Sequence, residues 1–366
     1  MSLPPQSPVR AWFAWIPRYE RQLSAFGMVA GFVTDNFMFR RIDLPNTQAV
    51  FIAYLAAAAF TILLLHALNA RADPEKPPPR WRGFIPLVTQ FALGGLWSGF
   101  LIFYTRSAVL LESWPFLLVL AAIFVGNEIF RHYYERLVFT ATLFFFGLFS
   151  YAIVTVPILT HRVGVFTFLL SGFAALAIFL AFLELLARFG RPSFESSKWQ
   201  IAIGAAAVYA LINLFWFTNV LPPLPVALAG AGVFHSVRHT GDAYIGTGEA
   251  KRWYTGMFSP QVVHVEPGRP LYVYSAVFAP VRFTERVVHS WQHFDPRRKR
   301  WIAVSNVSYT ISGGRDGGYR GYTIKRNPEP GEWRVDIALA AGHLLGRVRF
   351  RVERGAPPGL VSQSLE

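Results

Sequence analysis

The sequence predicts an α-helical transmembrane bundle of about seven spans, followed by an all-β, immunoglobulin-like antiparallel sandwich. Up to about residue 233 the chain is a series of apolar segments with few charges, each long enough to cross a bilayer. From about residue 262 apolar and polar residues alternate, which is typical of strands with one buried face. A mean hydropathy of +0.34 is too high for an ordinary soluble protein.

Seven apolar segments make up the predicted bundle. The first is the weakest of them, because it is short and contains Asp35 and Asn36. After the last, three prolines within residues 222–225 end any regular helix. The expected spans are residues 23–39, 48–68, 84–104, 114–130, 137–159, 163–186 and 200–220.

Seven strands are predicted in the C-terminal part, separated by turns rich in Gly and Pro. They are expected at residues 262–266, 271–278, 284–294, 301–311, 319–325, 332–339 and 344–352. The chain then divides into a cytoplasmic interfacial leader (1–22), a transmembrane helical domain (23–233), a linker (234–260), a β-sandwich domain (261–354) and a disordered tail (355–366).

Basic residues in the loops predict the orientation and explain much of the formal net charge of +14. With the N-terminus inside, twelve Lys and Arg fall in inner segments and four in outer loops, which favours this topology. An odd number of spans then places the C-terminal domain outside the cytoplasm. If the first segment does not span, the domain is cytoplasmic. Because topology and strand edges account for most of the positive charge, we expect no nucleic-acid partner.

Ionisable residues inside the spans are the best local indicators of function, because placing each one in a membrane costs free energy. Asp35 has Arg40 and Arg41 one to two turns further on. Glu128 and Arg131 stand at i, i+3, which puts them on one helix face. The ordinary interpretation is structural pairs that hold helices together. The alternative is a polar pocket for a head group, an ion or a proton, formed by Asp35, Asn127, Glu128 and Arg131.

A candidate ligand-binding face lies on the strand predicted at residues 319–325. Arg320 and Tyr322 share a face of that strand and Lys325 follows closely, so an anion or a sugar phosphate is a suitable ligand. The alternative is a solvated basic edge strand, which discourages aggregation. His289 and Trp291, on the strand at 284–294, are further ligand-binding candidates, although Trp291 is also a natural core residue.

No metal site and no cofactor are expected. The chain has no cysteine, which excludes disulfides and thiolate ligands. His235 and His239 stand at i, i+4 with Asp242 nearby, a spacing that can place both imidazoles on one helix face. Two interfacial histidines on a linker are the simpler interpretation. His289 and His293 lie roughly 13 Å apart along one strand, so they cannot bind the same ion without a bulge.

Three motifs stand out in the C-terminal part. They are a His-x-Trp strand on His289 and Trp291, a Tyr-Arg-x-x-Ser/Thr-x-Lys segment on Tyr319, Arg320, Thr323 and Lys325, and a Gly-x-Trp-x-Val strand on Gly331, Trp333 and Val335. Together they resemble the small bacterial domain known as domain of unknown function 2914. The membrane half is similar to the multi-span region that accompanies this domain, through residues 31–43, the pair Asn127-Glu128 and residues 219–225. The resemblance implies this architecture and a bacterial envelope setting, without a substrate or catalytic residue. Together with the count of basic residues, it predicts an inner-membrane protein with a cytoplasmic N-terminus and a periplasmic C-terminal domain.

These features favour a membrane protein without catalysis of its own. In the first hypothesis, the helices anchor an extracytoplasmic β-sandwich that binds an envelope component, such as a glycan, a lipid head group or a protein. In the second, the chain is a membrane-embedded transferase or transporter for a lipid-linked substrate, and it uses the polar residues of the spans. In the third, it is a sensor or scaffold subunit that acts through a separate partner. The sequence leaves the oligomeric state open.

Overall fold

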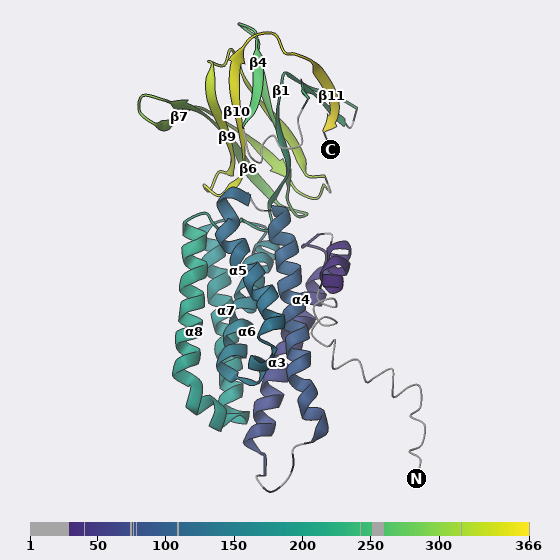
Figure 1. Cartoon of the computed structure of the whole chain (residues 1–366), viewed down its shortest axis with the longest axis vertical. Coiled ribbons are helices and arrows are strands. Elements are labelled where there is room, and N and C mark those ends of the chain that lie inside the picture. Colours follow the sequence, from purple (N-terminus) through teal and green to yellow (C-terminus); the bar gives the residue numbers. More distant parts are fainter. Residues whose placement is uncertain are drawn as a thin grey trace, which may run out of the picture. The chain divides into compact units, whose positions relative to one another are not determined.

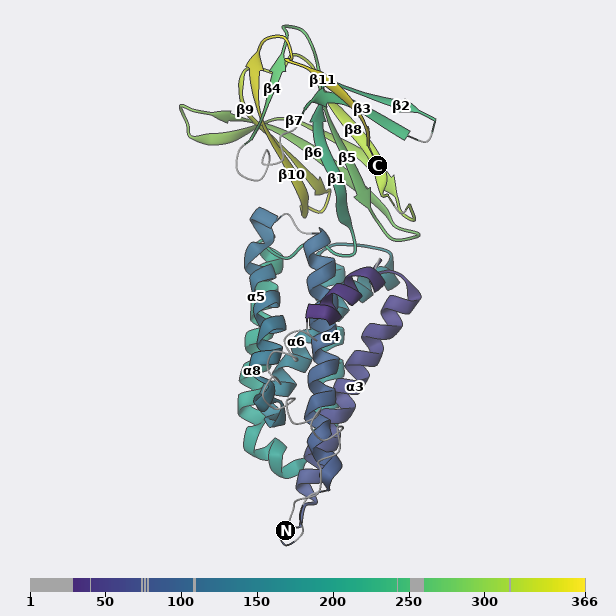
Figure 2. The same ribbon diagram turned by 45° about the vertical axis from the view of Figure 1, so that its right-hand side comes forward.

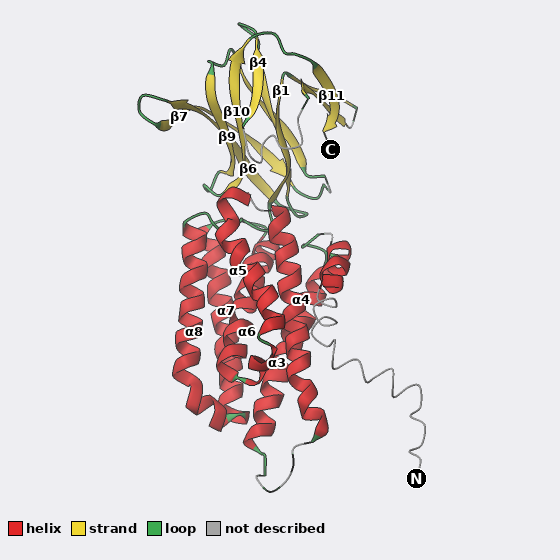
Figure 3. Cartoon of the chain, in the orientation of Figure 1, coloured by secondary structure: helices red, strands yellow, loops and turns green. Residues whose placement is uncertain are grey.

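The structure is a computed structural model that places helices first and strands afterwards (Figure 3). It describes residues 29–39, 41–73, 75, 77, 79–107, 110–241, 243–250, 260–315 and 317–365. The predicted leader, residues 1–22, and the first part of the first predicted span lie outside the described residues. The chain packs into two compact units. The first consists of Met1–Phe103, Leu118–Gly147 and Phe179–Ala205. The second consists of Tyr104–Leu117, Leu148–Ile178 and Ala206–Glu366.

Six long helices correspond to the last six predicted spans. They are α3 (Pro45–Ala70), α4 (Phe84–Ser107), α5 (Leu110–Ile129), α6 (Leu137–Thr160), α7 (Val165–Phe189) and α8 (Arg191–Phe217). Five of the described helices, α3, α4, α6, α7 and α8, are long and apolar enough to cross a membrane, and α5 carries a shorter apolar stretch, Ser113–Ile129. Residues 29–38 are also helical and form the end of the first predicted span.

Helix α8 begins nine residues before the predicted span at 200–220, at Arg191. Hydropathy marks the part of a helix that fits a bilayer, whereas the helix itself starts where its backbone can turn. Pro192 occupies the second helical position, where its missing N–H removes nothing that the helix uses. The basic residues counted there as loop charges therefore stand on the first turns of a helix.

The C-terminal part forms three sheets (Figures 1 and 2). One contains β1 (Ala227–Phe234), β5 (Leu271–Phe278) and β8 (Tyr319–Lys325), paired antiparallel. The second runs in the order β4 (Gln261–Val265), β10 (Leu344–Arg354), β9 (Gly331–Leu339), β6 (Thr284–Asp295) and β7 (Arg300–Ser312). The third contains β11 (Leu360–Leu365), β3 (Ala243–Glu249) and β2 (Ser236–Thr240).

The first two sheets bury a shared apolar core, which makes the domain a β-sandwich. Leu271 and Val273 of β5 pack with Trp291, Trp333 and Phe350 of the five-stranded sheet. The indole rings of Trp291 and Trp333 meet edge to face, with 6.4 Å between their centroids. The alternation of apolar and polar residues along β9 and β10 predicts one buried face for each strand, and the structure has this arrangement.

Four strands stand where other structures are expected. Strand β1 lies at the end of the predicted transmembrane domain, β2 and β3 lie in the predicted linker, and β11 lies in the predicted disordered tail. Strand β1 consists largely of Ala and Gly, so it lacks the alternation that marks a strand, and its backbone is held by pairing with β5. The sheet is also not wholly antiparallel, because β4 pairs with β10 in parallel.

In the second unit, the ends of three helices contact the sandwich. The backbone N–H of Val163, between α6 and α7, donates a hydrogen bond of 3.2 Å to the Glu285 carboxylate. The Trp216 ring of α8 lies 4.3 Å from the ring of His343, in the turn between β9 and β10. The domain is therefore packed against helix ends within this unit.

The His-x-Trp motif forms part of a buried polar network between the two facing sheets. His289 hydrogen-bonds through Nε2 to Ser275 Oγ and through Nδ1 to Thr323 Oγ1, at 2.9 Å in each case. Trp291 Nε1–H donates to the same Thr323 oxygen at 2.9 Å, and Tyr309 reaches Ser275 at 2.5 Å. The network joins β6 and β7 to β5 and β8, so it helps to fix how the two sheets pack.

Burial corrects the prediction that His289 and Trp291 belong to a ligand-binding face, because both side chains are inaccessible to solvent, and it confirms the other interpretation of Trp291, a core residue. Burial also lowers the pKa of His289 from an ordinary 6.5 to about 4, so the imidazole is neutral at physiological pH. Between these two values the unfolded chain binds a proton that the folded chain excludes. The stability of the domain therefore falls as pH drops from 6.5 towards 4 and is unaffected by this group at higher pH.

Replacing Thr323 by Val tests the network. Val has the shape of Thr but no hydroxyl, so Trp291 Nε1 and His289 Nδ1 are left buried without partners. We expect a loss of about 2–4 kcal/mol in the free energy of unfolding, measured by pulse proteolysis of the full chain in urea. The matched control is Thr310→Val on the exposed face of β7, which should change stability by less than about 0.5 kcal/mol. Equal effects of the two substitutions would contradict the structural role of the network.

Candidate functional site

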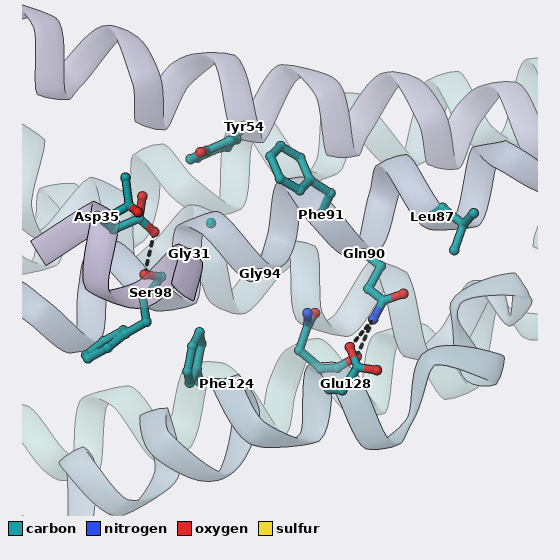
Figure 4. Close-up of a pocket in the computed structure, with 14 residues that line it drawn as sticks. Gly31, Asp35, Tyr54, Leu87, Gln90, Phe91, Gly94, Ser98, Phe124 and Glu128 are labelled. Atoms are coloured by element: carbon teal, nitrogen blue, oxygen red, sulfur yellow. Dashed lines mark hydrogen bonds between the residues drawn. The ribbon is translucent and has the colours of Figure 1, made fainter. Parts of the chain in front are cut away.

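A pocket of about 470 Å³ opens in the first unit between residues 31–35 and helices α3, α4 and α5 (Figure 4). We call it the Asp35–Glu128 pocket. It gathers side chains from four parts of the chain that are far apart in sequence. Its main polar lining residues are Asp35, Tyr54, Gln90, Ser98, Asn127 and Glu128.

Asp35 is held in this pocket by α4. Its carboxylate accepts a hydrogen bond from Ser98 Oγ at 2.5 Å (Figure 4). The predicted pairing with Arg41 is wrong, because Arg41 forms an ion pair of 2.7 Å with Asp43, two residues further on. Arg40, the other predicted partner, lies outside the described residues. Asp35 thus points to a hydroxyl partner across the helix interface.

Asn127 and Glu128 enter the pocket from the end of α5. The Gln90 side-chain amide of α4 donates to the Asn127 carbonyl at 3.0 Å and to the Glu128 carboxylate at 3.3 Å. The Asn127 side-chain oxygen accepts a hydrogen bond from the Tyr134 hydroxyl. The side chain of Arg131 lies outside the described residues, so its predicted pairing with Glu128 stays a prediction.

Two adjacent glycines of α4 make the pocket. A Cβ on Gly95 would lie 2.5 Å from the Tyr54 ring of α3, and a Cβ on Gly94 would lie 2.8 Å from the Asn127 amide of α5. Only glycine lets both neighbouring helices approach this closely. Tyr54, Gln90 and Ser98 were not predicted as site residues. The Gly-Gly pair, which lies between Gln90 and Ser98 in the chain, was the available signal.

The pocket is acidic within and apolar at its rim. Two carboxylates line it, and none of its described lining residues is Lys or Arg. Phe91 and Leu87, which also line it, are 71% and 53% exposed on the surface of the described part of the unit. Such a lining suits a molecule with a cationic or hydrogen-bond-donating head and an apolar tail.

The described residues contain no group of three His, Cys, Asp or Glu side chains placed to hold a metal ion. His235 and His239 do not lie on one helix face, because His239 lies on strand β2. His235 instead hydrogen-bonds to the Glu249 carboxylate at 3.2 Å, and the His239 ring lies 4.7 Å from that of Tyr244. Asp242 lies outside the described residues.

Strand β8 divides the other predicted binding residues between its two faces. Arg320 and Tyr322 alternate onto one face, as predicted, and Tyr322 is 40% exposed. Lys325 lies on the opposite face, where its Nζ stands 5.8 Å from the centre of the Trp333 ring. Arg320 instead shares a polar concavity of about 400 Å³ with Arg315, His239 and Tyr244.

The fold and the site together define a class of protein: a chain whose described residues include five helices long and apolar enough to cross a membrane, followed by a C-terminal β-sandwich. Residues 284–352 match the family described as Protein of unknown function (DUF2914), which confirms the resemblance seen in the sequence motifs. The match runs from β6 to β10 and contains His289, Trp291 and Thr323. These three residues belong to the buried network, whereas Ser275, on β5, lies outside the match.

No curated protein matches the chain. Among solved structures, the chain is similar to an immunoglobulin-like protein from Pseudomonas aeruginosa, with 12% identity, 33% of this chain and 97% of that chain covered, and a TM-score of 0.19. It is also similar to a β-glucosidase from Listeria innocua, with 10% identity, 32% of this chain and 17% of that chain covered, and a TM-score of 0.19. A third similar structure is an alkylpurine DNA glycosylase from Pseudomonas fluorescens, with 11% identity, 84% of this chain and 99% of that chain covered, and a TM-score of 0.21. Likenesses at this level carry no argument about activity.

Charge-selective labelling tests the character of the pocket. Because the chain has no cysteine, Gln90→Cys introduces a single thiol into it. We expect a cationic methanethiosulfonate to react at least about fivefold faster than an anionic one of similar size, since two carboxylates line the pocket. Glu128→Gln in the same background should lower this ratio. Equal rates for the two reagents would contradict an acidic pocket, and Ser171→Cys, which is fully buried in α7, should react with neither.

Proposed function

We propose that the helical part binds, in the Asp35–Glu128 pocket, the head group of a lipid or lipid-linked molecule taken from the bilayer. The observation that carries the proposal is convergence. Asp35, Asn127 and Glu128, which the sequence marks as polar residues of the spans, line one cavity instead of standing in separate pairs. Polar residues at membrane depth are costly, and a shared cavity is the arrangement expected of a binding site.

The chemistry of the lining favours a head group that donates hydrogen bonds. The Asp35 and Glu128 carboxylates are acceptors, and each already receives one hydrogen bond, from Ser98 and from Gln90. An ionised carboxylate can accept several more. A primary ammonium or a group of sugar hydroxyls supplies such donors, and an ammonium also compensates the negative charge.

The rim favours an amphipathic ligand over a free ion. Phe91 and Leu87 present apolar surface beside the polar lining, on helix α4. A lipid tail can lie against them while the head reaches Asp35. This arrangement supports the hypothesis of a transporter or transferase for a lipid-linked substrate, with binding as the step that the pocket explains.

Lipid retention tests this proposal. The full chain in phosphatidylcholine nanodiscs, supplied with phosphatidylethanolamine or monoglucosyl-diacylglycerol, should retain at least one of these guests on native mass spectrometry. Phosphatidylcholine carries a charged head without N–H or O–H donors, so it provides the reference. We expect Asp35→Asn and Glu128→Gln each to reduce retention by about tenfold or more, since each removes a charged acceptor.

The matched control is Glu184→Gln in α7. This carboxylate is exposed and pairs with Arg188 at 3.0 Å, away from the pocket lining. It should leave retention unchanged. The proposal fails if wild-type protein prefers neither guest, or if Asp35→Asn and Glu128→Gln behave like the control.

A second candidate function belongs to the sandwich: binding of an anionic envelope component, such as a glycan or another protein. The concavity lined by Arg315 and Arg320 supports it, because guanidinium groups recognise carboxylate and phosphate. Tyr322, on the same face of β8, adds a flat aromatic surface suited to a sugar ring.

This second function requires the sandwich to lie outside the cytoplasm, which a reporter fusion tests. We propose the inner membrane as the location, with the N-terminus in the cytoplasm, because the basic residues favour that side. A C-terminal alkaline phosphatase fusion should then be active, and a C-terminal green fluorescent protein fusion should be dark. The reverse result would place the domain in the cytoplasm and rule out an envelope ligand.

A further inference from the structure

A second cavity in the first unit, of about 830 Å³, lies where α3 ends, where η2 (Arg131–Glu135) leads into α6, and where α8 begins. We call it the His66 pocket. Its lining is polar on one side and includes His66, Asn69, Glu135, Arg136, Ser193 and Ser197. None of these residues takes part in the Asp35–Glu128 pocket.

His66 is buried without hydrogen-bond partners for its ring. The residue is 3% exposed, and neither Nδ1 nor Nε2 has a partner among the described residues. Of the two other buried imidazoles among the described residues, His289 has partners on both nitrogens, and His343 has none on Nε2. An unpartnered buried ring is costly. Both nitrogens are inaccessible in this arrangement, so a ligand in the cavity that His66 lines can supply the missing partner only once the ring turns.

The surroundings of His66 favour an anion. Arg136 is held in place by the ring of Tyr133, with 4.5 Å between the guanidinium carbon and the ring centre. Helix α8 has 27 residues and starts at Arg191, separated from the end of α7 by one residue, and it has no acidic residue in its first turn. The hydroxyls of Ser193 and Ser197 stand on its first two turns and line the pocket. A helix start with hydroxyls and a guanidinium nearby is a frequent setting for phosphate.

One further basic residue lies near this cavity, because Arg82 donates to Asn69, a lining residue, at 2.9 Å. Arg188 and Lys198, on the ends of α7 and α8, are paired with Glu184 and Glu195, so they add no unpaired positive charge. Glu135 also lines the pocket, and its negative charge lowers the affinity for any anion.

We propose that the His66 pocket binds a phosphate group, carried either by a phospholipid head or by a soluble phosphate compound. Arg136 and the hydroxyls of α8 would hold the phosphate oxygens, and His66 would donate a hydrogen bond to it. The cavity is large enough for more than one inorganic phosphate, which leaves room for the rest of the ligand. The proposal does not depend on a ligand in the Asp35–Glu128 pocket.

The test uses the full chain in phosphate-free maltoside micelles. One arm titrates inorganic phosphate by calorimetry, and the other measures retention of phosphatidylglycerol against monoglucosyl-diacylglycerol by native mass spectrometry. Binding of inorganic phosphate identifies a soluble ligand, and retention of phosphatidylglycerol alone identifies a lipid head. Absence of both in the wild-type chain overturns the proposal.

Variants of opposite sign make the test specific. Arg136→Gln should weaken binding by about tenfold or more, and Glu135→Gln should strengthen it, because the opposing carboxylate is removed. Ser193→Ala with Ser197→Ala replaces Arg136→Gln if that variant fails to fold.

Lys198→Gln is the control, since Lys198 is exposed, pairs with Glu195 at 2.9 Å and does not line the cavity. Asp35→Asn should have no effect here. Unchanged affinity in both Arg136→Gln and Glu135→Gln overturns the proposal.

Discussion

Removing a polar side chain from water costs free energy unless another group takes the place of the water, and this cost shapes both units of the chain. In the sandwich, the His289 imidazole is satisfied by Ser275 and Thr323, so a polar group can stand between two apolar sheets. Among the helices, Asp35 is satisfied by Ser98. His66 is nearly as deeply buried, but neither of its ring nitrogens has a partner among the described residues, and the buried His343 lacks one on Nε2. A cavity lies beside His66, and there we propose a ligand.

The helical site depends further on how closely helices can approach. In a bilayer, helix association rests on packing and hydrogen bonds, since lipid tails are as apolar as the helices themselves. Gly94 and Gly95 let α4 come near α5 and α3, and this contact brings Asn127 and Tyr54 to one cavity. A larger residue at either position would push apart the helices that carry the polar groups. Small residues thus allow the helix approach that forms the pocket, while charged residues determine its chemistry.

The sequence predicted the elements better than their partners, for a physical reason. Hydropathy and alternation are local patterns, so α3 to α7 and strands β5 and β8 fall close to the predicted bounds. Strand β1 was missed because its Ala and Gly residues have no alternation, and its place is fixed by pairing with β5. Asp35 was marked correctly as a costly residue, but its partner was sought nearby in the chain. Ser98, the actual partner, is brought to Asp35 by tertiary packing, which no local pattern encodes. The motif residues His289 and Trp291 were recognised correctly and given a surface role, whereas they hold the core.

The two helical cavities share one short element, and this gives the helical unit a route between them. In η2, the Tyr134 hydroxyl donates to Asn127, which lines the Asp35–Glu128 pocket. Its neighbours Tyr133 and Glu135 line the His66 pocket. Tyr134 thus contacts a residue that lines one cavity, and its two neighbours in the chain line the other. A ligand that shifted η2 from either cavity would change the free energy of binding in the second, and by linkage the effect would be reciprocal. The two proposed sites, one for a donor head and one for a phosphate, would then suit a molecule that carries both groups.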